Sequence, residues 1–312
     1  MALMNKASLV IIHFGSIDLI NNLLYSLDKA PLIKYYINEI IIIDNQGNLG
    51  VELIYNIKNM KIDVIKNKND GFSKSVNIGV FRSSNDLVII SNNDIEFLPY
   101  QDLSPLIYEI SKEGVGVVGP QLIYKDYRLQ RSYGYIPSLK EAIYYCLFID
   151  SLYLRLLGYI FKSHSFLNKP KSVDYIRGTF MVTRKEYFNK VGGFDEAFLF
   201  YGEDSDYCHK LKKIGLKAVL VPKVKIVHIE GEGSYRKESK KYLLKLFESK
   251  LFQYKLYNKD IKKYYNLLKI ALIERKVYYF IKYILLRKQF YYNKYKDYEF
   301  VLKNISNKLV KN

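Results

Sequence analysis

The chain has 312 residues, of which 49% are hydrophobic and 26% charged, a composition typical of an ordinary globular protein with one large domain or two. Its two cysteines and the lack of any Cys/His cluster at zinc spacing exclude a disulfide framework and a zinc finger, and they favour a reducing compartment. No signal-peptide pattern and no apolar run of about 18 residues occur, so we expect a cytoplasmic chain without a membrane span.

The net charge of +18 is concentrated near the C-terminus. From Tyr235 to Asn312 the chain has 21 Lys and Arg against 6 Asp and Glu, a net of +15, which leaves only +3 for residues 1–234. The basicity is therefore a property of the tail, and any partner that it attracts has to be explained separately from the rest of the chain.

Short apolar runs alternate with helix-like segments in the first half of the chain. Strands are predicted at 8–13, 39–43, 62–65 and 87–90, and helices at 18–27 and 73–81. The strand runs are continuously apolar, which is typical of a largely parallel sheet covered by helices on both faces. Ligands of such α/β sheets bind beyond the carboxyl ends of the strands, where His13, Asp44, Asn45 and Asp94 stand.

The second half of the chain continues this α/β pattern and then becomes helical. Strands are predicted at 115–119, 175–183 and 218–227, with Pro222 interrupting the last one before it ends at His228. We expect an α/β domain over residues 1–234, with a helical insertion at about 137–170, and a basic, tyrosine-rich helical region over 235–312.

The segment 192–209 carries the strongest local signal. A Gly-Gly-Phe-Asp-Glu turn leads to a helix that opens with three carboxylates, Glu203, Asp204 and Asp206. Free N–H groups and the macrodipole stabilise negative charge in the first turn of a helix. Because Glu203 and Asp206 share a face, Asp204 can point elsewhere, into a cleft. The arrangement suits a fixed general base, and it equally suits a well-capped surface helix.

A series of motifs over roughly residues 8–234 resembles family 2 glycosyltransferases with a GT-A fold, in the branch that includes bacterial rhamnosyltransferases. The matching stretches, in order, are Leu9-Val10-Ile11-Ile12, Ile42-Ile43-Asp44-Asn45, Asn69-Asp70-Gly71-Phe72, Asn77-Ile78-Gly79, Ser91-Asn92-Asn93-Asp94, Val118-Gly119-Pro120-Gln121, Arg177-Gly178, Val191-Gly192-Gly193-Phe194-Asp195-Glu196, Glu203-Asp204-Ser205-Asp206 and His228. Each is weak alone, and their ordered combination is specific.

The resemblance implies a nucleotide site near the first three strands. Asp44 would accept a hydrogen bond from the imide N–H of uracil or thymine, which favours a UDP- or dTDP-sugar; a turn aspartate is the alternative. Asn69, Gly71 and Asn77 would lie beside the nucleoside, where glycine permits close backbone approach. Relatives often read Asn-Tyr-Asn where this chain has His13-Phe14-Gly15, and His13 could still stack on the base or hydrogen-bond it.

The resemblance also implies a metal site. Asn92-Asn93-Asp94 occupies the place of the family's Asp-x-Asp motif, with Asn92 in place of the first aspartate. Asp94 and His228 are the implied ligands of Mn²⁺ or Mg²⁺, which would neutralise the diphosphate of the donor. Asn92 and Asn93 would line the donor site. A lone histidine at a strand end can instead be structural.

The catalytic roles follow from the same resemblance. Asp204 is the implied general base of a single displacement with inversion, and Glu203 could bind the acceptor. Asp195 could contact the donor sugar or only secure the Gly-Gly turn. Arg177 and Gly178 could border the pyrophosphate or the sugar, although Arg177 could equally be a structural ion-pair partner.

The implied function is an inverting hexosyltransferase. It would transfer a sugar from a UDP- or dTDP-sugar, with dTDP-rhamnose favoured, to a hydroxyl of a glycan or a polyprenyl-linked acceptor in surface polysaccharide synthesis. UDP-galactose, UDP-glucose and UDP-N-acetylglucosamine remain alternative donors. A nucleotidyltransferase is a rival, but it should have a glycine- and lysine-rich phosphate loop where this chain reads His13-Phe14-Gly15-Ser16-Ile17-Asp18.

The tail allows several partners. Its lysines could meet anionic lipid while Tyr, Leu and Ile lie at the interface, which would make the protein peripheral at the inner face of the plasma membrane. The helices could instead pack on the catalytic domain or on a second subunit in a homodimer. Nucleic-acid binding is a further rival because basic and aromatic residues interleave, but no nucleic-acid motif is present.

Overall fold

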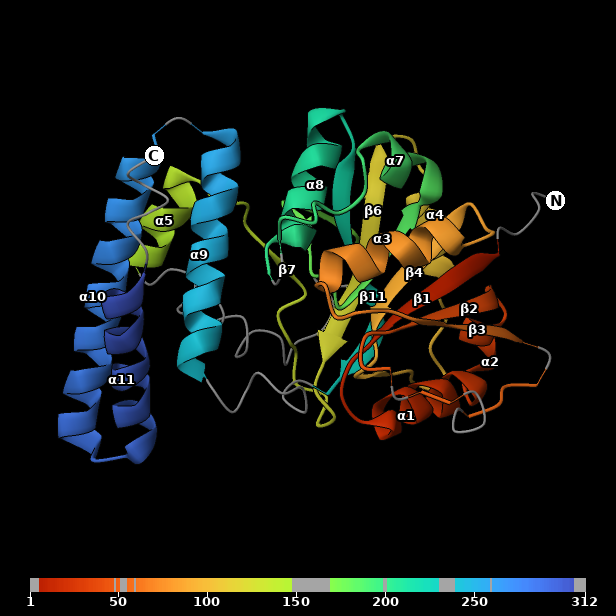
Figure 1. Ribbon diagram of the computed structural model, residues 1–312, viewed down its shortest axis with the longest axis horizontal. Helices are drawn as coiled ribbons and strands as arrows, with labels where there is room; N and C mark the ends of the chain where they lie inside the picture. Colours follow the sequence, from red (N-terminus) through yellow and green to blue (C-terminus); the bar gives the residue numbers. More distant parts are fainter. Residues whose placement is uncertain are drawn as a thin grey trace. The chain divides into compact units, whose positions relative to one another are not determined.

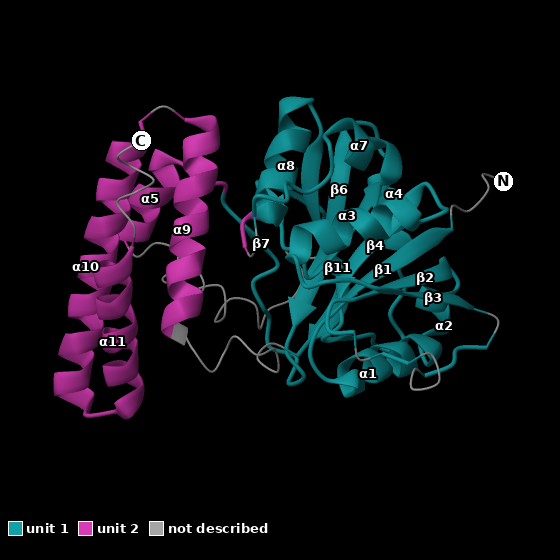
Figure 2. Ribbon diagram, in the orientation of Figure 1, with its two compact units in different colours: residues 1–135, 164–199, 203–234 teal, residues 136–163, 200–202, 235–312 magenta. Residues whose placement is uncertain are grey.

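A computed structural model of the chain describes residues 6–47, 49–50, 55–58, 60–147, 169–198, 201–229, 239–258 and 260–305. The chain divides into two compact units, coloured separately in Figure 2. Unit 1 comprises residues 1–135, 164–199 and 203–234, and unit 2 comprises residues 136–163, 200–202 and 235–312.

Unit 1 is built on a nine-stranded mixed sheet in the order β3-β2-β1-β4-β10-β6-β11-β5, with β8 paired to β11 (Figure 1). The strands are β1 Ala7–His13, β2 Ile37–Asp44, β3 Lys61–Lys66, β4 Leu87–Asn92, β5 Ile95–Glu96, β6 Val115–Ile123, β8 Lys171–Val173, β10 Phe180–Arg184 and β11 Lys217–His228. A separate two-stranded sheet joins β7 Tyr133–Gly134 to β9 Tyr175–Ile176.

Helices cover both faces of this sheet. They are α1 Ile17–Asp28, α2 Pro31–Lys34, α3 Phe72–Arg82, α4 Ser104–Ile110, α7 Lys185–Lys190 and α8 Glu203–Lys213. Successive strand residues point to opposite faces, so Leu9 and Ile11 enter the core that contains α1, α2 and α4 residues, whereas Val10 and Ile12 enter the core that contains α3 and α8 residues. Burial on both faces explains the continuously apolar strands and confirms the predicted α/β sheet.

One strand runs against the others in the centre of the sheet. β10 is antiparallel to both of its neighbours, β4 and β6, with Phe180 opposite Ser91. The start of β10 therefore lies at the edge of the sheet where β1, β2 and β4 end. The strand predicted at 175–183 is divided in the structure, because Tyr175–Ile176 pairs with β7 before the chain enters β10.

Unit 2 is helical. It contains α5 Leu139–Cys146, α9 Ser239–Tyr257, α10 Ile261–Leu286 and α11 Gln289–Asn304. Its core is rich in tyrosine, and the rings of Tyr254 and Tyr264 stack with their centroids 4.1 Å apart. Glu141 of α5 accepts a hydrogen bond from the Tyr264 hydroxyl at 3.0 Å. Much of the tyrosine content of the tail therefore serves packing within this unit.

The helical insertion predicted at about 137–170 is described only in part, because residues 148–168 lie outside the described residues. Its described helix, α5, packs with the C-terminal helices and contributes the fully buried Ala142 to their core. None of the helices in the described ranges has an apolar stretch long enough to cross a bilayer.

Candidate active site

The candidate active site lies at the edge of the unit 1 sheet where β1, β2, β4 and β11 end and β10 begins. Parallel pairing aligns His13 at the end of β1 with Asp44 at the end of β2. Antiparallel pairing of β5 with β11 sets His228 opposite Ile95, so Asp94 stands beside the end of β11. The topology thus brings together residues that the sequence separates widely.

Asp94 and His228 form the central pair of this edge. Asp94 Oδ2 lies 3.4 Å from His228 Nε2, and the backbone N–H of Ile229 donates to the carbonyl of Asp94 at 2.8 Å. Both side chains are largely buried, and Asp94 Oδ1 has no hydrogen-bond partner among the described residues. A buried carboxylate oxygen without a partner is costly unless something else neutralises it.

Gln130 fixes the orientation of the histidine. Its Nε2 donates to the backbone carbonyl of His228 at 2.7 Å, which turns its Oε1 to His228 Nδ1 at 2.8 Å. Nδ1 must therefore be the protonated nitrogen, and the lone pair of a neutral ring is on Nε2, facing the carboxylate of Asp94. Two acceptors that face each other at this distance require a proton or a cation between them.

Asn93 turns away from this pair. Its side-chain nitrogen lies 2.8 Å from His13 Nδ1 and donates to the carbonyl of Phe14 at 3.0 Å. His13 is fully buried, so its ring has no exposed face on which a nucleotide base could stack. In this structure Asn93 and His13 join the end of β4 to the end of β1. Asn92 donates its backbone N–H to the carbonyl of Thr179 at 3.0 Å, joining β4 to the start of β10.

Asp204, at the start of α8, is held at the same edge. Its Oδ2 accepts the backbone N–H of Gly178 at 3.0 Å, and its Oδ1 accepts that of Ser205 at 2.7 Å. Burial raises the pKa of Asp204, while the Gly178 N–H and the charge of Arg177 act in the opposite direction. The carbonyl of the residue after Gly178, Thr179, bonds Asn92. These contacts connect the Asp204 carboxylate to the Asn92-Asn93-Asp94 segment.

The other two carboxylates of α8 have different surroundings. Glu203 is 7% exposed, and its Oε2 has no hydrogen-bond partner in the part of the chain that the structure describes. Burial and then the charge of Asp204 raise the pKa of Glu203 to about 8, so it is largely protonated at neutral pH. Asp206 is fully buried and lies 3.3 Å from Lys210 Nζ, within the helix.

Asp44 holds its own loop in this structure. Its Oδ1 accepts the backbone N–H groups of Gln46 and Gly47 at 3.0 and 2.9 Å, and its Oδ2 accepts that of Leu49 at 3.0 Å. The carboxylate is fully buried. This geometry matches the turn role left open above, and recognition of a base by Asp44 stays a prediction.

The predicted nucleoside residues on α3 are placed differently from one another. Gly71 precedes α3 with φ +108°, a conformation that favours glycine, and Asn69 is exposed beside it. Asn77 instead faces the loop before α8, where its amide donates to the carbonyl of Phe194 at 2.9 Å and accepts the N–H of the same residue at 2.9 Å. Asn77 thus holds that loop on α3.

The Gly-Gly-Phe-Asp-Glu loop is tightly fitted against this amide. A side chain on Gly193, which has φ +66°, would meet Asn77 Oδ1 at 2.7 Å and the ring of Phe188 at 2.8 Å. Asp195 Oδ1 accepts the N–H of Ala197 at 2.9 Å, which is the turn-securing role. The loop therefore requires glycine at position 193.

Two residues that no sequence motif marks, Gln130 and Ser132, connect the parts of the site. Gln130 orients His228, and the carbonyl of Ser132 accepts the backbone N–H of Arg177 at 3.0 Å. The short segment that contains them links His228 to the Arg177-Gly178 segment, which holds Asp204. Neither residue lies in a helix or strand pattern, so no local signal could have identified them.

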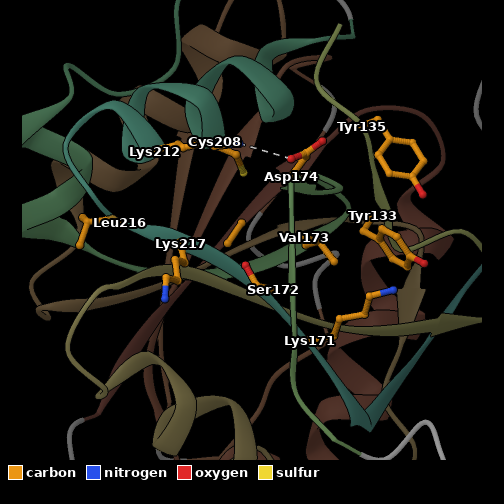
Figure 3. A pocket seen from close by; sticks show the side chains of 11 residues that line it. Tyr133, Tyr135, Lys171, Ser172, Val173, Asp174, Cys208, Lys212, Leu216 and Lys217 are labelled. Carbon is orange, nitrogen blue, oxygen red and sulfur yellow. Dashed lines mark ion pairs between the residues drawn. The ribbon is translucent and has the colours of Figure 1, made fainter. Parts of the chain in front are cut away.

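A separate pocket of about 250 Å³ is lined by residues of β7, β8, α8 and the start of β11 (Figure 3). Lys171, Lys217 and Tyr133 are among its lining residues, and Lys212 pairs with Asp174 at 3.5 Å. Since Lys217 begins β11 and His228 ends it, this pocket lies at the opposite end of the strand from the candidate active site.

Two models of known protein families match the sequence of this chain. The model of glycosyl transferase family 2 matches residues 8–192, and the model described as the N-terminal domain of galactosyltransferase matches residues 160–232. Among solved structures, GalNAc-T7 with UDP, GalNAc and Mn²⁺ is 16% identical with a TM-score of 0.61, over 84% of this chain and 50% of that one. A mannosyltransferase from Pyrobaculum calidifontis in complex with GDP-Man and Mn²⁺ is 12% identical with a TM-score of 0.63. This match covers 98% of this chain and 89% of the mannosyltransferase chain.

Two curated rhamnosyltransferases match shorter stretches. The N-acetylglucosaminyl-diphospho-decaprenol L-rhamnosyltransferase of Mycobacterium tuberculosis is 33% identical over 66 residues, 21% of this chain and 22% of that protein. The rhamnosyltransferase WbbL of Escherichia coli is 38% identical over 56 residues, 18% and 21% of the two chains. These alignments span only about a fifth of the length of either relative.

The family model covers more than half of the chain, and the two solved glycosyltransferases share its fold. The resemblance of the motifs and the predicted fold are both confirmed. The chain belongs to glycosyl transferase family 2 and has a GT-A fold, and short stretches of it are similar to two rhamnosyltransferases.

Proposed function

We propose that this protein transfers a sugar, with inversion, from a UDP- or dTDP-sugar to a hydroxyl group of a glycan or a lipid-linked acceptor. The proposal rests on one observation: Asp94, His228 and Asp204 lie at the same edge of the sheet. Asp94 contacts His228 directly, and hydrogen bonds through residues 178–179 and Asn92 connect Asp204 to the same segment. The donor diphosphate would lie beside Asp94 and His228, and the acceptor hydroxyl would lie beside Asp204.

The residues at Asp94 fit a divalent metal ion such as Mn²⁺ or Mg²⁺. A cation would neutralise the unpartnered Oδ1 of Asp94 and could take the place of a proton between Asp94 Oδ2 and His228 Nε2. The 3.4 Å between these two atoms is close to the ~3 Å that separates adjacent ligands of an octahedral ion. The described residues contain no cluster of three or more side chains able to hold a metal ion, so diphosphate oxygens and water would complete the shell. When bound, the ion would neutralise charge that develops on the diphosphate.

Asp204 would act on the acceptor. As the acceptor oxygen bonds to the anomeric carbon, the bond from that carbon to the diphosphate breaks and Asp204 takes the hydroxyl proton. The raised pKa makes this carboxylate a stronger base than an exposed aspartate. Protonated Glu203, beside it in α8, could donate a hydrogen bond to the substrate.

dTDP-rhamnose is our preferred donor, supported by the names of the two curated relatives. The name of the mycobacterial relative includes a decaprenyl diphosphate acceptor, which supports a polyprenyl-linked acceptor and a role in surface polysaccharide synthesis here. Such an acceptor would hold the enzyme at the inner face of the plasma membrane. UDP-galactose, UDP-glucose and UDP-N-acetylglucosamine are the alternative donors to compare.

Calorimetric titration of UDP, dTDP and GDP, each with and without Mn²⁺, tests the donor site. We expect metal-dependent binding of UDP or dTDP that Asp94→Ala removes. Asp204→Asn should keep this binding and lower turnover of the matching nucleotide-sugar by about 10²- to 10⁴-fold. No nucleotide binding by the wild type, or full turnover by Asp204→Asn, would refute the proposal.

A further inference from the structure

Helix α10 of unit 2 is apolar on its outer face as well as its inner one. Ile270, Ile273, Val277, Phe280, Ile281 and Ile284 are each 43–49% exposed. We call these six residues the α10 stripe. They recur at three- and four-residue intervals, so they lie along one side of the helix for about four turns.

Among the described residues of unit 2, most of the α10 stripe lies away from the packed side of α10, although the ring of Phe280 lies 5.2 Å from that of Tyr295 in α11. The residues of α10 that are buried lie on the opposite side of the helix; they are Tyr264, Tyr265, Leu268, Ala271, Leu272 and Arg275. A surface helix normally has a polar outer face, and one that is apolar on both sides has a second apolar environment to meet. A contiguous exposed patch of this kind marks a protein or membrane contact.

Basic residues stand at both ends of the α10 stripe. Lys262, Lys263 and Lys269 precede or flank its start, and Arg287 and Lys288 follow its end, all of them exposed. Glu274 is the one acidic residue in the sequence of α10. The surface that covers the stripe must therefore accept apolar side chains in its middle and positive charge at both ends.

A second copy of this chain does not meet that requirement. The spacing of the stripe is also that of a coiled-coil seam, so a helix is the rival partner. An antiparallel pair centred on Val277 would set the lysines at one end of each helix against the basic residues at the other end of its partner. A parallel pair would set each lysine against its own copy. Both arrangements join like charges.

We infer that the α10 stripe and its flanking basic residues bind the surface of an anionic lipid bilayer. The apolar side chains would enter the headgroup boundary with the helix lying in the plane of the membrane, and the lysine and arginine heads would reach the anionic headgroups. This inference deepens the proposed lipid-linked acceptor by assigning the face of unit 2 that meets the lipid.

Sedimentation of the full chain with vesicles tests the inference without donor or acceptor, so its failure would leave the proposed transferase activity standing. Vesicles of phosphatidylcholine alone are compared with vesicles that contain phosphatidylglycerol, at low and high salt. We expect binding to the anionic vesicles that salt weakens. Equal binding to both kinds of vesicle, or to neither, would overturn the inference.

The α10 stripe is tested by Val277→Glu combined with Ile284→Glu. We expect at least about a tenfold loss of vesicle binding, with an unchanged circular dichroism spectrum, because the apolar insertion is blocked. The control pair, Leu32→Glu with Phe81→Glu, makes the same kind of change at exposed apolar positions of unit 1 and should bind as the wild type does. Unchanged binding by the stripe variant would overturn the inference.

The charge contribution is tested by replacing Lys262, Lys263 and Lys269 with glutamine. Each basic residue should contribute about fivefold to vesicle binding, so we expect the triple variant to bind anionic vesicles about 100-fold more weakly. Its binding should also depend less steeply on salt. A control variant with the same charge change in unit 1, at Lys171, Lys217 and Lys223, should lose much less vesicle binding. A wild type that is dimeric in solution and that Val277→Glu makes monomeric, without vesicle binding, would show that a second copy covers the stripe.

Discussion

Replacement of the buried Glu203 by glutamine should change how the stability of the protein depends on pH. Burial and the charge of Asp204 raise the pKa of Glu203 to about 8 in the folded protein, whereas the ordinary value is 4.5. Between these two values the folded state binds a proton that the unfolded state has lost. The free energy of unfolding must therefore fall as the pH rises through this window.

The magnitude follows from this difference in pKa. Each pH unit within the window can cost the wild type up to about 1.4 kcal/mol of stability through this one group. From pH 5.5 to 7.5 the upper limit is about 2.7 kcal/mol, and relaxation around the ionised carboxylate reduces it, so we expect about 1–2 kcal/mol. With an unfolding entropy of about 2.1 cal/mol/K per residue, a chain of 312 residues should lose about 1.5–3 °C in Tm.

Thermal unfolding followed by circular dichroism at several pH values measures the effect. Glu203→Gln keeps the shape of the side chain and removes its titration, so its Tm should fall less than that of the wild type between pH 5.5 and 7.5. Glu113→Gln, at an exposed position, is the matched control and should follow the wild type. Parallel curves for wild type and Glu203→Gln would refute the reasoning that Glu203 is buried and protonated.

Two further predictions test the supports of the site. Gln130→Ala should weaken metal-dependent nucleotide binding by about 10- to 100-fold, because His228 loses its orienting partner. The control Gln101→Ala removes another amide bonded to β11 and should leave the binding unchanged. Equal calorimetric affinities of the two variants would contradict the orienting role of Gln130. Gly193→Ala should cost about 3 kcal/mol in denaturant unfolding, since its new methyl group meets an amide oxygen and a phenyl ring at 2.7 and 2.8 Å. Gly192→Ala, with a similar φ and open space, should cost only about 1 kcal/mol, and equal losses would argue against the close fit.

The sequence predicted the layers of unit 1 better than the directions of its strands. Continuous apolar runs indicate strands buried on both faces, and this held for β1, β2 and β4. An apolar run carries no direction, however, so the reversal of β10 between two neighbours could not be predicted from it. The same limit applies to α5, because an amphipathic pattern does not identify the helices against which it packs.

The site was predictable where charge or motif order marked it. Asp94 and His228 were paired by resemblance, and they lie beside each other in the structure. Gln130 was not predictable, because an uncharged amide outside any periodic pattern acquires its role only when β6, β11 and the loop after β6 are assembled. Asn77 was expected at the nucleoside, yet it holds the loop before α8 through contacts 117 residues away in the chain.

The pairing of β5 with β11 has a consequence for biosynthesis. His228 follows Gln130 by 98 residues, and Asp94 emerges from the ribosome before either of them. At about 5–20 residues per second, that separation alone corresponds to roughly 5–20 s of translation. During this time the nascent chain carries the aspartate without the histidine that will stand beside it. A ribosome-bound intermediate halted before β11 should therefore lack the metal-dependent nucleotide binding that we propose for the full chain, although β1 to β4 are already synthesised.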